Sequence, residues 1–181
     1  MLGGNRVAVL VEEGFEDSEL VESIKALKDA GAKVVVIGSG SQDNYRGERM
    51  KAQIKPNVNA NEVNAADFDA VIIPGGHAPD KMQLHQSMID LVREAFNSGK
   101  IVAAICHGPQ LLIPANVVKG RRVTSWHSVA ADLRNAGAEW VDEPVVRDGN
   151  LITSRKPVDI PKFNKVIIEA LKERYGMPSV K

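Results

Sequence analysis

Short hydrophobic runs recur along the chain, and segments with a helical pattern separate them. The runs are continuous and rich in valine and isoleucine, which is typical of strands buried on both faces of a parallel sheet. We expect such strands at residues 6–11, 33–37, 69–74 and 101–105, with a shorter one at 121–125.

The intervening segments place apolar residues three or four positions apart, which is the spacing of one helical face. These faces comprise Leu20, Ile24 and Leu27, then Ile89, Val92 and Phe96, and finally Phe163, Val166, Ile167, Ala170 and Leu171. We expect Asp17 or Ser18 to cap the first helix, and we expect further helices from the strand at 101–105 to about Val118 and at 129–136. Alternating strands and helices predict an α/β fold, a flavodoxin-like three-layer sandwich with a mostly parallel central sheet, in one domain spanning 1–181.

Two segments interrupt this alternation. Residues 39–64 are rich in Gly, Asn, Ser and charge, and we expect short edge strands at about 48–54 and 56–60. Near the end of the chain, residues 140–146 and 151–154 flank an Asp-Gly pair, which predicts a β-hairpin.

Composition narrows the function classes. The chain has 23 Lys and Arg residues against 23 Asp and Glu, so nothing suggests nucleic acid or a membrane surface as a partner. It has one cysteine, no signal-peptide pattern and no apolar run near the roughly 18 residues that span a bilayer, so we expect a cytoplasmic protein. Its four histidines lack metal-site spacing and no phosphate-binding glycine loop is present, so we predict neither metal nor cofactor.

The single cysteine follows directly after the predicted buried strand at 101–105. Cys106, His107, Gly108 and Pro109 then lead into a new apolar segment. A nucleophile at such a turn forms a nucleophile elbow, in which N–H groups favour the thiolate. The alternative is an inert buried cysteine, and His107 with the small residues around it favours the reactive interpretation.

A second glycine-rich turn ends the neighbouring predicted strand. Gly75 and Gly76 let backbone N–H groups face a ligand at the carboxyl end of the sheet. These N–H groups and that of His107 are candidate oxyanion donors for a Cys106 nucleophile, although a plain tight turn is the alternative for the glycines.

Several motifs together resemble the PfpI family of intracellular cysteine proteases, in the class I glutamine-amidotransferase-like superfamily that also includes the parkinsonism-associated protein deglycase. The motifs are Phe-Glu-Asp-Ser-Glu-Leu at 15–20, Pro-Gly-Gly-His-Ala-Pro at 74–79, Ala-Ile-Cys-His-Gly-Pro-Gln at 104–110, Asn-Ala-Gly-Ala-Glu-Trp-Val-Asp at 135–142 and Asp-Gly-Asn at 148–150. They are spread over nearly the whole chain, and the elbow with the Pro-Gly-Gly loop is the most specific combination.

The resemblance implies roles for individual residues. Cys106 would be the nucleophile and His107 its general base, while Glu19, with Glu16 as the fallback, would donate to the thiolate. Asp80 stands where the family often has a glutamate that completes the triad of a neighbouring subunit, so the resemblance implies a homo-oligomer of dimers that form a hexamer. The pair Trp126 and His127 would lie over the pocket.

Three functions stay open at this stage. The family name favours a cysteine hydrolase acting on peptides. The same thiol would equally suit a glyoxalase III-type enzyme or deglycase that converts methylglyoxal, or its adducts on proteins, to lactate, so the expected partner is a peptide or a small carbonyl compound. The third possibility is a redox-sensing or chaperone-like stress protein whose thiol is oxidised.

Overall fold

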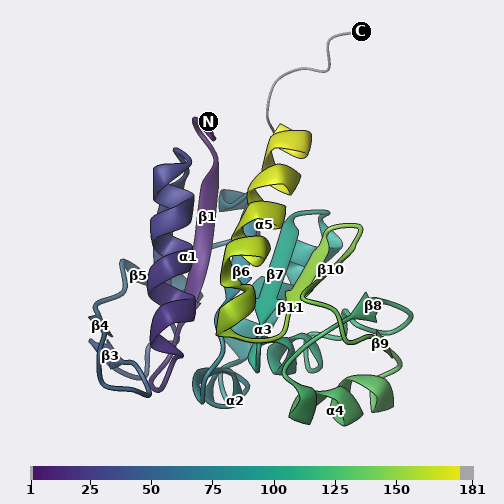
Figure 1. Cartoon of the computed structure of the whole chain (residues 1–181). Coiled ribbons are helices and arrows are strands. Elements are labelled where there is room, and N and C mark those ends of the chain that lie inside the picture. Colours follow the sequence, from purple (N-terminus) through teal and green to yellow (C-terminus); the bar gives the residue numbers. More distant parts are fainter. Residues whose placement is uncertain (1, 176–181) are drawn as a thin grey trace, which may run out of the picture.

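The computed structural model describes residues 2–175, with the side chain of Tyr175 excepted, and is built on one seven-stranded sheet (Figure 1). The sheet order is β10-β11-β7-β6-β1-β2-β5. Its strands are β1 (Arg6–Val11), β2 (Lys33–Gly38), β5 (Val58–Asn59), β6 (Ala70–Ile73), β7 (Ile101–Ile105), β10 (Val145–Asp148) and β11 (Leu151–Ser154). All neighbours are parallel except β10 and β11. The predicted mostly parallel sheet is confirmed.

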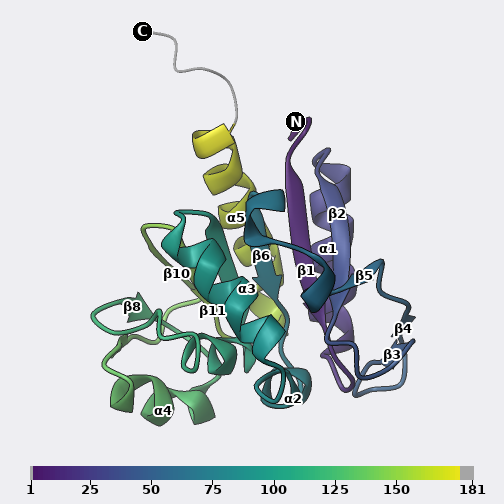
Figure 2. The ribbon, with the colours of Figure 1, turned by 180° about the vertical axis from the view of Figure 1, so that it is seen from behind.

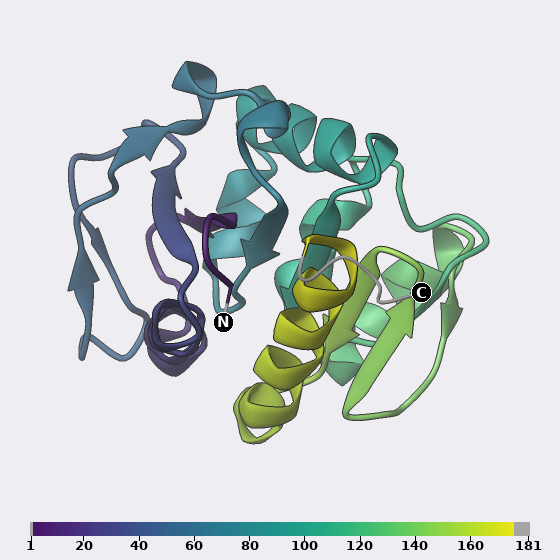
Figure 3. The same ribbon diagram turned by 90° about the horizontal axis from the view of Figure 1, so that it is seen from above.

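Helices cover both faces of this sheet and complete the three layers. They are α1 (Asp17–Asp29), α2 (Ala78–Met82), α3 (Gln86–Asn97), α4 (Ala130–Asn135) and α5 (Ile160–Tyr175). Helices α1 and α5 lie on one face, and α3 covers the other (Figures 1, 2 and 3). No helix within residues 2–175 is long and apolar enough to cross a membrane.

The central strands form the core. Every residue of β6 and β7 is buried, as is β1 from Val7 onward. Burying one large aliphatic side chain contributes about 1.5–3 kcal/mol, so these strands hold the carboxyl edge of the sheet rigidly. Ile73 of β6 lies in register with Ala104 of β7, which sets the Pro-Gly-Gly loop beside Cys106.

The prediction of a helix running from the strand at 101–105 to about Val118 is wrong. A 3-10 helix covers only Gly108–Leu112, and turns follow. Pro114 explains this, because it lacks the N–H that a continuing α-helix requires, whereas Pro109 stands in the first turn, where proline is tolerated. Asn116 then takes a left-handed conformation with φ of 59°, which also stops a helix.

The predicted hairpin is displaced toward the C-terminus. β9 (Glu139–Trp140) pairs with β8 (Arg122–Val123) in a separate parallel two-stranded sheet instead of joining the hairpin. The strand that pairs with β11 is β10, and the turn carries Gly149 at φ of 60°. Pro144 lies between β9 and β10. Because it has no N–H to donate to a sheet, it ends any continuous strand between them.

The 39–64 segment contains an antiparallel pair, β3 (Tyr45–Arg46) and β4 (Gln53–Ile54), besides the edge strand β5. The strand expected from residue 48 therefore begins only at Gln53. The intervening turn is held by Asp17, whose carboxylate accepts the N–H groups of Arg49, Lys51 and Ala52. Asp17 is thus engaged with this turn, and the α1 cap is Glu16.

The remaining short elements are 3-10 helices, each of one turn. They are η1 (Ala60–Glu62), η2 (Ala65–Asp67), η4 (His127–Val129) and η5 (Pro157–Asp159), with η3 being the segment Gly108–Leu112 already described. η4 and η5 follow β8 and β11, and they bring Trp126 and Pro157 to the same edge of the sheet as Cys106.

Candidate active site

Cys106 occupies a sharp turn at the carboxyl end of β7. Its φ is 64°, a left-handed conformation that non-glycine residues adopt at a cost. The turn is held on both sides, because the Cys106 N–H donates to the Ser154 carbonyl at 3.0 Å and its carbonyl accepts the Trp126 N–H at 2.9 Å. A strained, well-anchored residue between a strand and a helical turn is the geometry of a nucleophile elbow.

Glycines allow the neighbouring backbone to approach the elbow. A Cβ on Gly75 would lie 2.6 Å from Glu19 Oε1 and 2.9 Å from the Cys106 Cβ. A Cβ on Gly108 would overlap the Ile73 carbonyl oxygen. Both positions therefore exclude any side chain.

Glu19 lies fully buried beside the thiol, in the first turn of α1. Its Oε1 accepts the Gly75 N–H at 2.8 Å, whereas Oε2 has no hydrogen-bond partner of good geometry among the described residues. Burial, together with the nearby Glu16 carboxylate, raises the pKa of Glu19 to about 8. At neutral pH Glu19 is therefore mainly protonated and has a proton to donate.

The thiol itself experiences opposing influences. Burial and the Glu19 carboxyl raise the pKa of Cys106, while the N–H groups of His107 and Gly76 lower it. The donors expected at the elbow are present and act toward the thiolate as predicted, but burial outweighs them, so the net shift of the Cys106 pKa is upward. Of the two glycines, Gly76 directs its N–H at sulfur, whereas the Gly75 N–H is already bound by Glu19.

His107 contacts the thiol through Nδ1, which lies 3.5 Å from the Cys106 Sγ. Its Nε2 lies 3.4 Å from the Ser128 hydroxyl, and no carboxylate within residues 2–174 forms an ion pair with the ring. Burial lowers the pKa of His107 and the nearby His77 adds to this, while Glu48 opposes it. The His107 imidazole is therefore in position to accept the thiol proton as a general base.

The sulfur opens onto a cavity of about 330 Å³. Residues from six segments line it, namely Glu16, Glu48, Arg49, Gly76, His77, Cys106, His107, Trp126 and Pro157. Cys106 is only 8% exposed, so a reactant reaches it through this cavity. Residues 2–175 contain no cluster of three or more His, Cys, Asp or Glu residues that would hold a metal ion.

Comparison with known proteins assigns this arrangement to a family. The model of the DJ-1/PfpI family matches residues 5–170. The chain belongs to the DJ-1/PfpI family. It is 40% identical to protein/nucleic acid deglycase 2 of Escherichia coli over 92% of this chain and 97% of that protein. It is 39% identical to deglycase PfpI of Pyrococcus furiosus over 92% of this chain and 99% of that protein.

A solved structure supports both the family and the fold. Drosophila melanogaster DJ-1beta superposes with a TM-score of 0.85 at 34% identity, over 96% of this chain and 91% of that one. The predicted PfpI resemblance and the flavodoxin-like α/β fold are both confirmed.

In this DJ-1/PfpI chain, the residues expected from the motifs do not all lie at the thiol. Glu16 caps α1, accepts the Glu19 N–H at 2.8 Å and lines the cavity with Trp126. His127 is not among the lining residues. Its ring stacks on Trp126 at 6.0 Å, and its Nε2 lies 3.2 Å from Asp142 Oδ1.

Asp80 lies on α2, exposed to solvent. It lines a different cavity of about 480 Å³ together with Gln83, Gln110 and Asp132, and it is not among the residues around the thiol. Within one chain Asp80 therefore does not complete a triad with His107. Its role toward a neighbouring subunit, and the predicted oligomer, stay predictions.

Sequence reasoning missed four of the lining residues: Glu48, Arg49, His77 and Pro157. Glu48 and Arg49 belong to the turn between β3 and β4, which has no periodicity and no recognisable motif. His77 directly follows Gly76, so its place in the Pro-Gly-Gly-His loop was the one available signal.

Proposed function

We propose that this protein is a cofactor-independent enzyme of the glyoxalase or deglycase type, which converts methylglyoxal or its adducts to lactate. The observation that carries the proposal is that buried Glu19, whose pKa burial raises to about 8, lies beside Cys106, while His107 Nδ1 lies 3.5 Å from the same sulfur. An acid and a base flanking one nucleophile match a reaction that moves protons between adjacent carbons. Two relatives with about 40% identity are named deglycases.

The first step joins sulfur to the aldehyde. His107 Nδ1 takes the thiol proton as Cys106 Sγ attacks the aldehyde carbon, and the N–H groups of Gly76 and His107 stabilise the developing oxyanion. His107 then returns its proton to that oxygen, giving a neutral hemithioacetal. For an adduct on an amine, the carbon–nitrogen bond breaks as sulfur takes its place, and the amine leaves with a proton.

The second step isomerises the hemithioacetal. His107 removes the hydrogen from the former aldehyde carbon as a proton while Glu19 protonates the neighbouring carbonyl oxygen, which gives an enediol. His107 then delivers its proton to the second carbon, and Glu19 recovers a proton from the first hydroxyl. A lactoyl thioester results, and water hydrolyses it to lactic acid and free Cys106. The sum is methylglyoxal plus water giving lactic acid, with every protein proton restored.

The cavity favours this reaction over peptide cleavage. About 330 Å³ and a thiol that is 8% exposed suit a three-carbon carbonyl compound better than a polypeptide strand.

The test is lactate formation from methylglyoxal, measured beside casein cleavage, for wild type and Cys106→Ala. We expect lactate from wild type, a loss of at least about 1000-fold in Cys106→Ala, and no casein cleavage. Since the alanine still fits the elbow, the melting temperatures of the two proteins should be similar. Lactate formation that survives Cys106→Ala, or casein cleavage without lactate, would contradict the proposal.

A further inference from the structure

Glu48 is a carboxylate that lines the Cys106 cavity, on a turn whose backbone is firmly held. Its backbone N–H donates to the Phe15 carbonyl at 2.8 Å, and the adjacent Gly47 N–H donates to the Ala52 carbonyl at 2.9 Å. Asp17, itself buried, holds the rest of this turn through three backbone N–H groups. These contacts place the Glu48 backbone at the rim of the cavity, and the side chain, 24% exposed, lines the same cavity as Cys106.

The negative charge of Glu48 acts on all three groups proposed to take part in the reaction. It contributes electrostatically at Glu19, at Cys106 and at His107, so its carboxylate faces the space that a substrate would occupy. Such interactions are strong where few water molecules separate the charges.

The other charged side chains in the cavity leave Glu48 as the uncompensated one. Glu16 Oε1 lies 3.5 Å from Arg49 Nε, which forms an ion pair. The contact of Glu48 Oε2 is with His77 Nδ1 at 3.8 Å, and that imidazole is 80% exposed. Arginine is always charged, so the residues that line the cavity include two carboxylates, Glu16 and Glu48, against one permanent cation, Arg49. The cavity therefore has an excess of negative charge beside the thiol.

We propose that Glu48 is a specificity-determining residue that makes the Cys106 cavity favour cationic over anionic reactants. Where the proposed function holds, on which the substrate assignment rests, the favoured class is carbonyl adducts on groups that keep a positive charge, such as a guanidinium. Carbonyl compounds carrying a carboxylate are disfavoured. Glu48 acts by attracting the charged end of the reactant, while the thiol chemistry belongs to the residues already described.

Thiol labelling tests the charge selectivity without any turnover. Cys106 is the only cysteine, so a methanethiosulfonate reagent reports on this cavity alone. The thiolate attacks the reagent's outer sulfur, a disulfide forms, and methanesulfinate leaves. We compare the aminoethyl reagent, which is cationic, with the sulfonatoethyl reagent, which is anionic, on wild type, Glu48→Gln and Glu94→Gln. Glu94 lies exposed on α3, outside the cavity, and is the matched control for loss of one carboxylate.

We expect the ratio of cationic to anionic labelling rates to fall between about threefold and tenfold in Glu48→Gln and to stay at the wild-type value in Glu94→Gln. High salt should reduce the wild-type ratio and have less effect on Glu48→Gln. An unchanged ratio in Glu48→Gln, or an equal change in Glu94→Gln, would overturn the proposal. Matching melting temperatures exclude a folding defect as the cause.

A second measurement separates this inference from the proposed function. For wild type and Glu48→Gln, kcat/KM is compared for the methylglyoxal adduct of N-acetylarginine and for glyoxylate, an anionic aldehyde. We expect Glu48→Gln to lose preference for the arginine adduct. If wild type releases no arginine or lactate but its labelling ratio depends on Glu48, the proposed function fails and the charge selectivity stands. If turnover occurs and neither measurement depends on Glu48, the proposed function stands and the proposed charge selectivity fails.

Discussion

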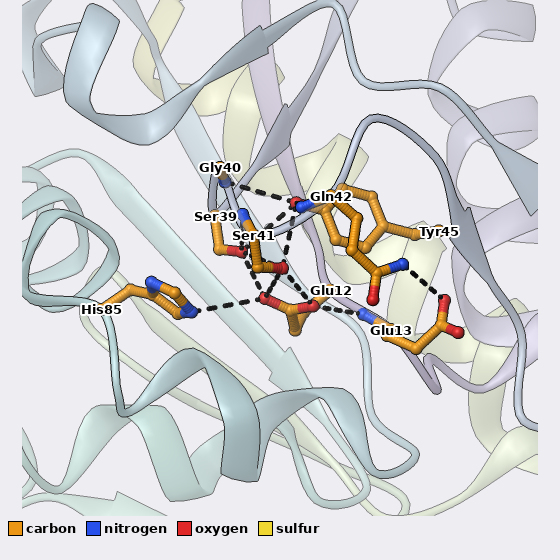
Figure 4. Close-up of polar contacts among 8 residues, drawn as sticks. All are labelled: Glu12, Glu13, Ser39, Gly40, Ser41, Gln42, Tyr45 and His85. Atoms are coloured by element: carbon orange, nitrogen blue, oxygen red, sulfur yellow. Dashed lines mark hydrogen bonds and ion pairs between the residues drawn. The ribbon is translucent and has the colours of Figure 1, made fainter.

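Two buried glutamates at the start of the chain differ in what surrounds them. Glu12 follows β1 and is 2% exposed, and Glu19 in α1 is fully buried. Glu12 accepts hydrogen bonds from the Ser39 hydroxyl, from the Ser41 hydroxyl at 2.9 Å and from the Glu13 N–H at 2.7 Å, and its Oε2 lies 3.6 Å from His85 Nε2 (Figure 4). Glu19 accepts one backbone N–H, and its second oxygen lacks such a partner among the described residues.

This difference assigns the two carboxyl groups to different tasks. The donors around Glu12 come from three segments, so that the carboxylate ties the end of β1 to the loop after β2 and to the start of α3. A buried polar group with all its partners present stabilises the fold. Glu19 has too few donors to balance its burial, and therefore keeps its proton beside Cys106. Both side chains are buried, so the number of hydrogen-bond donors is what distinguishes the structural Glu12 from the reactive Glu19.

The strongest test of the difference between Glu12 and Glu19 is to remove the acidic proton of Glu19 while keeping the shape of its side chain. In Glu19→Gln the amide oxygen still accepts the Gly75 N–H, but the side chain has no acidic proton. We expect lactate formation from methylglyoxal to fall about 1000-fold, which is the middle of the range for loss of general acid–base catalysis. Steady-state kinetics at saturating methylglyoxal measure this. A decrease of less than about threefold would show that the proton of Glu19 is not used.

The same change at Glu12 should affect stability instead. Glu12→Gln replaces one acceptor oxygen with an NH₂ group facing donors, which leaves buried donors without partners. We expect the free energy of unfolding to fall by about 1–3 kcal/mol, as measured by urea denaturation. The remaining folded protein should retain its lactate-forming activity. A stable Glu12→Gln variant with the activity loss of Glu19→Gln would reverse the two assignments.

The sequence predicted the parts of this molecule that repeat a simple pattern. Continuous apolar runs identified β1, β2, β6 and β7, because a strand buried on both faces has no polar positions. The elbow was also predictable, since Cys106 directly follows such a run and small residues surround it. The motifs around Glu19 then supplied the acid.

Other features depend on contacts between segments distant in sequence, which no local pattern encodes. Glu12 and Glu19 both belong to one acidic stretch, and only the positions of Ser39, Ser41 and His85 distinguish them. Glu48 reaches the thiol because Asp17 holds its turn, a long-range interaction. The prediction for the segment after the elbow failed for a local reason, because its apolar residues suggested a helix that Pro114 interrupts.

The central claim, that Glu19 keeps its proton in the folded protein, is tested most directly by the pH dependence of stability. The folded pKa of about 8 lies above the ordinary value of 4.5, so between these values the folded state binds more protons than the unfolded state. The proton on Glu19 therefore contributes to the free energy of unfolding. This contribution is fully present below about pH 4.5 and is lost as pH rises toward 8.

The measurement is urea denaturation of wild type and Glu19→Gln at intervals from pH 5 to pH 9, where the difference between the two proteins isolates Glu19. We predict that wild type loses on the order of 3 kcal/mol more than Glu19→Gln over this range, with the divergence ending near pH 8. Parallel curves for the two proteins, or a wild type that gains stability relative to the variant as pH rises, would show that Glu19 is ionised in the folded state and would contradict the account.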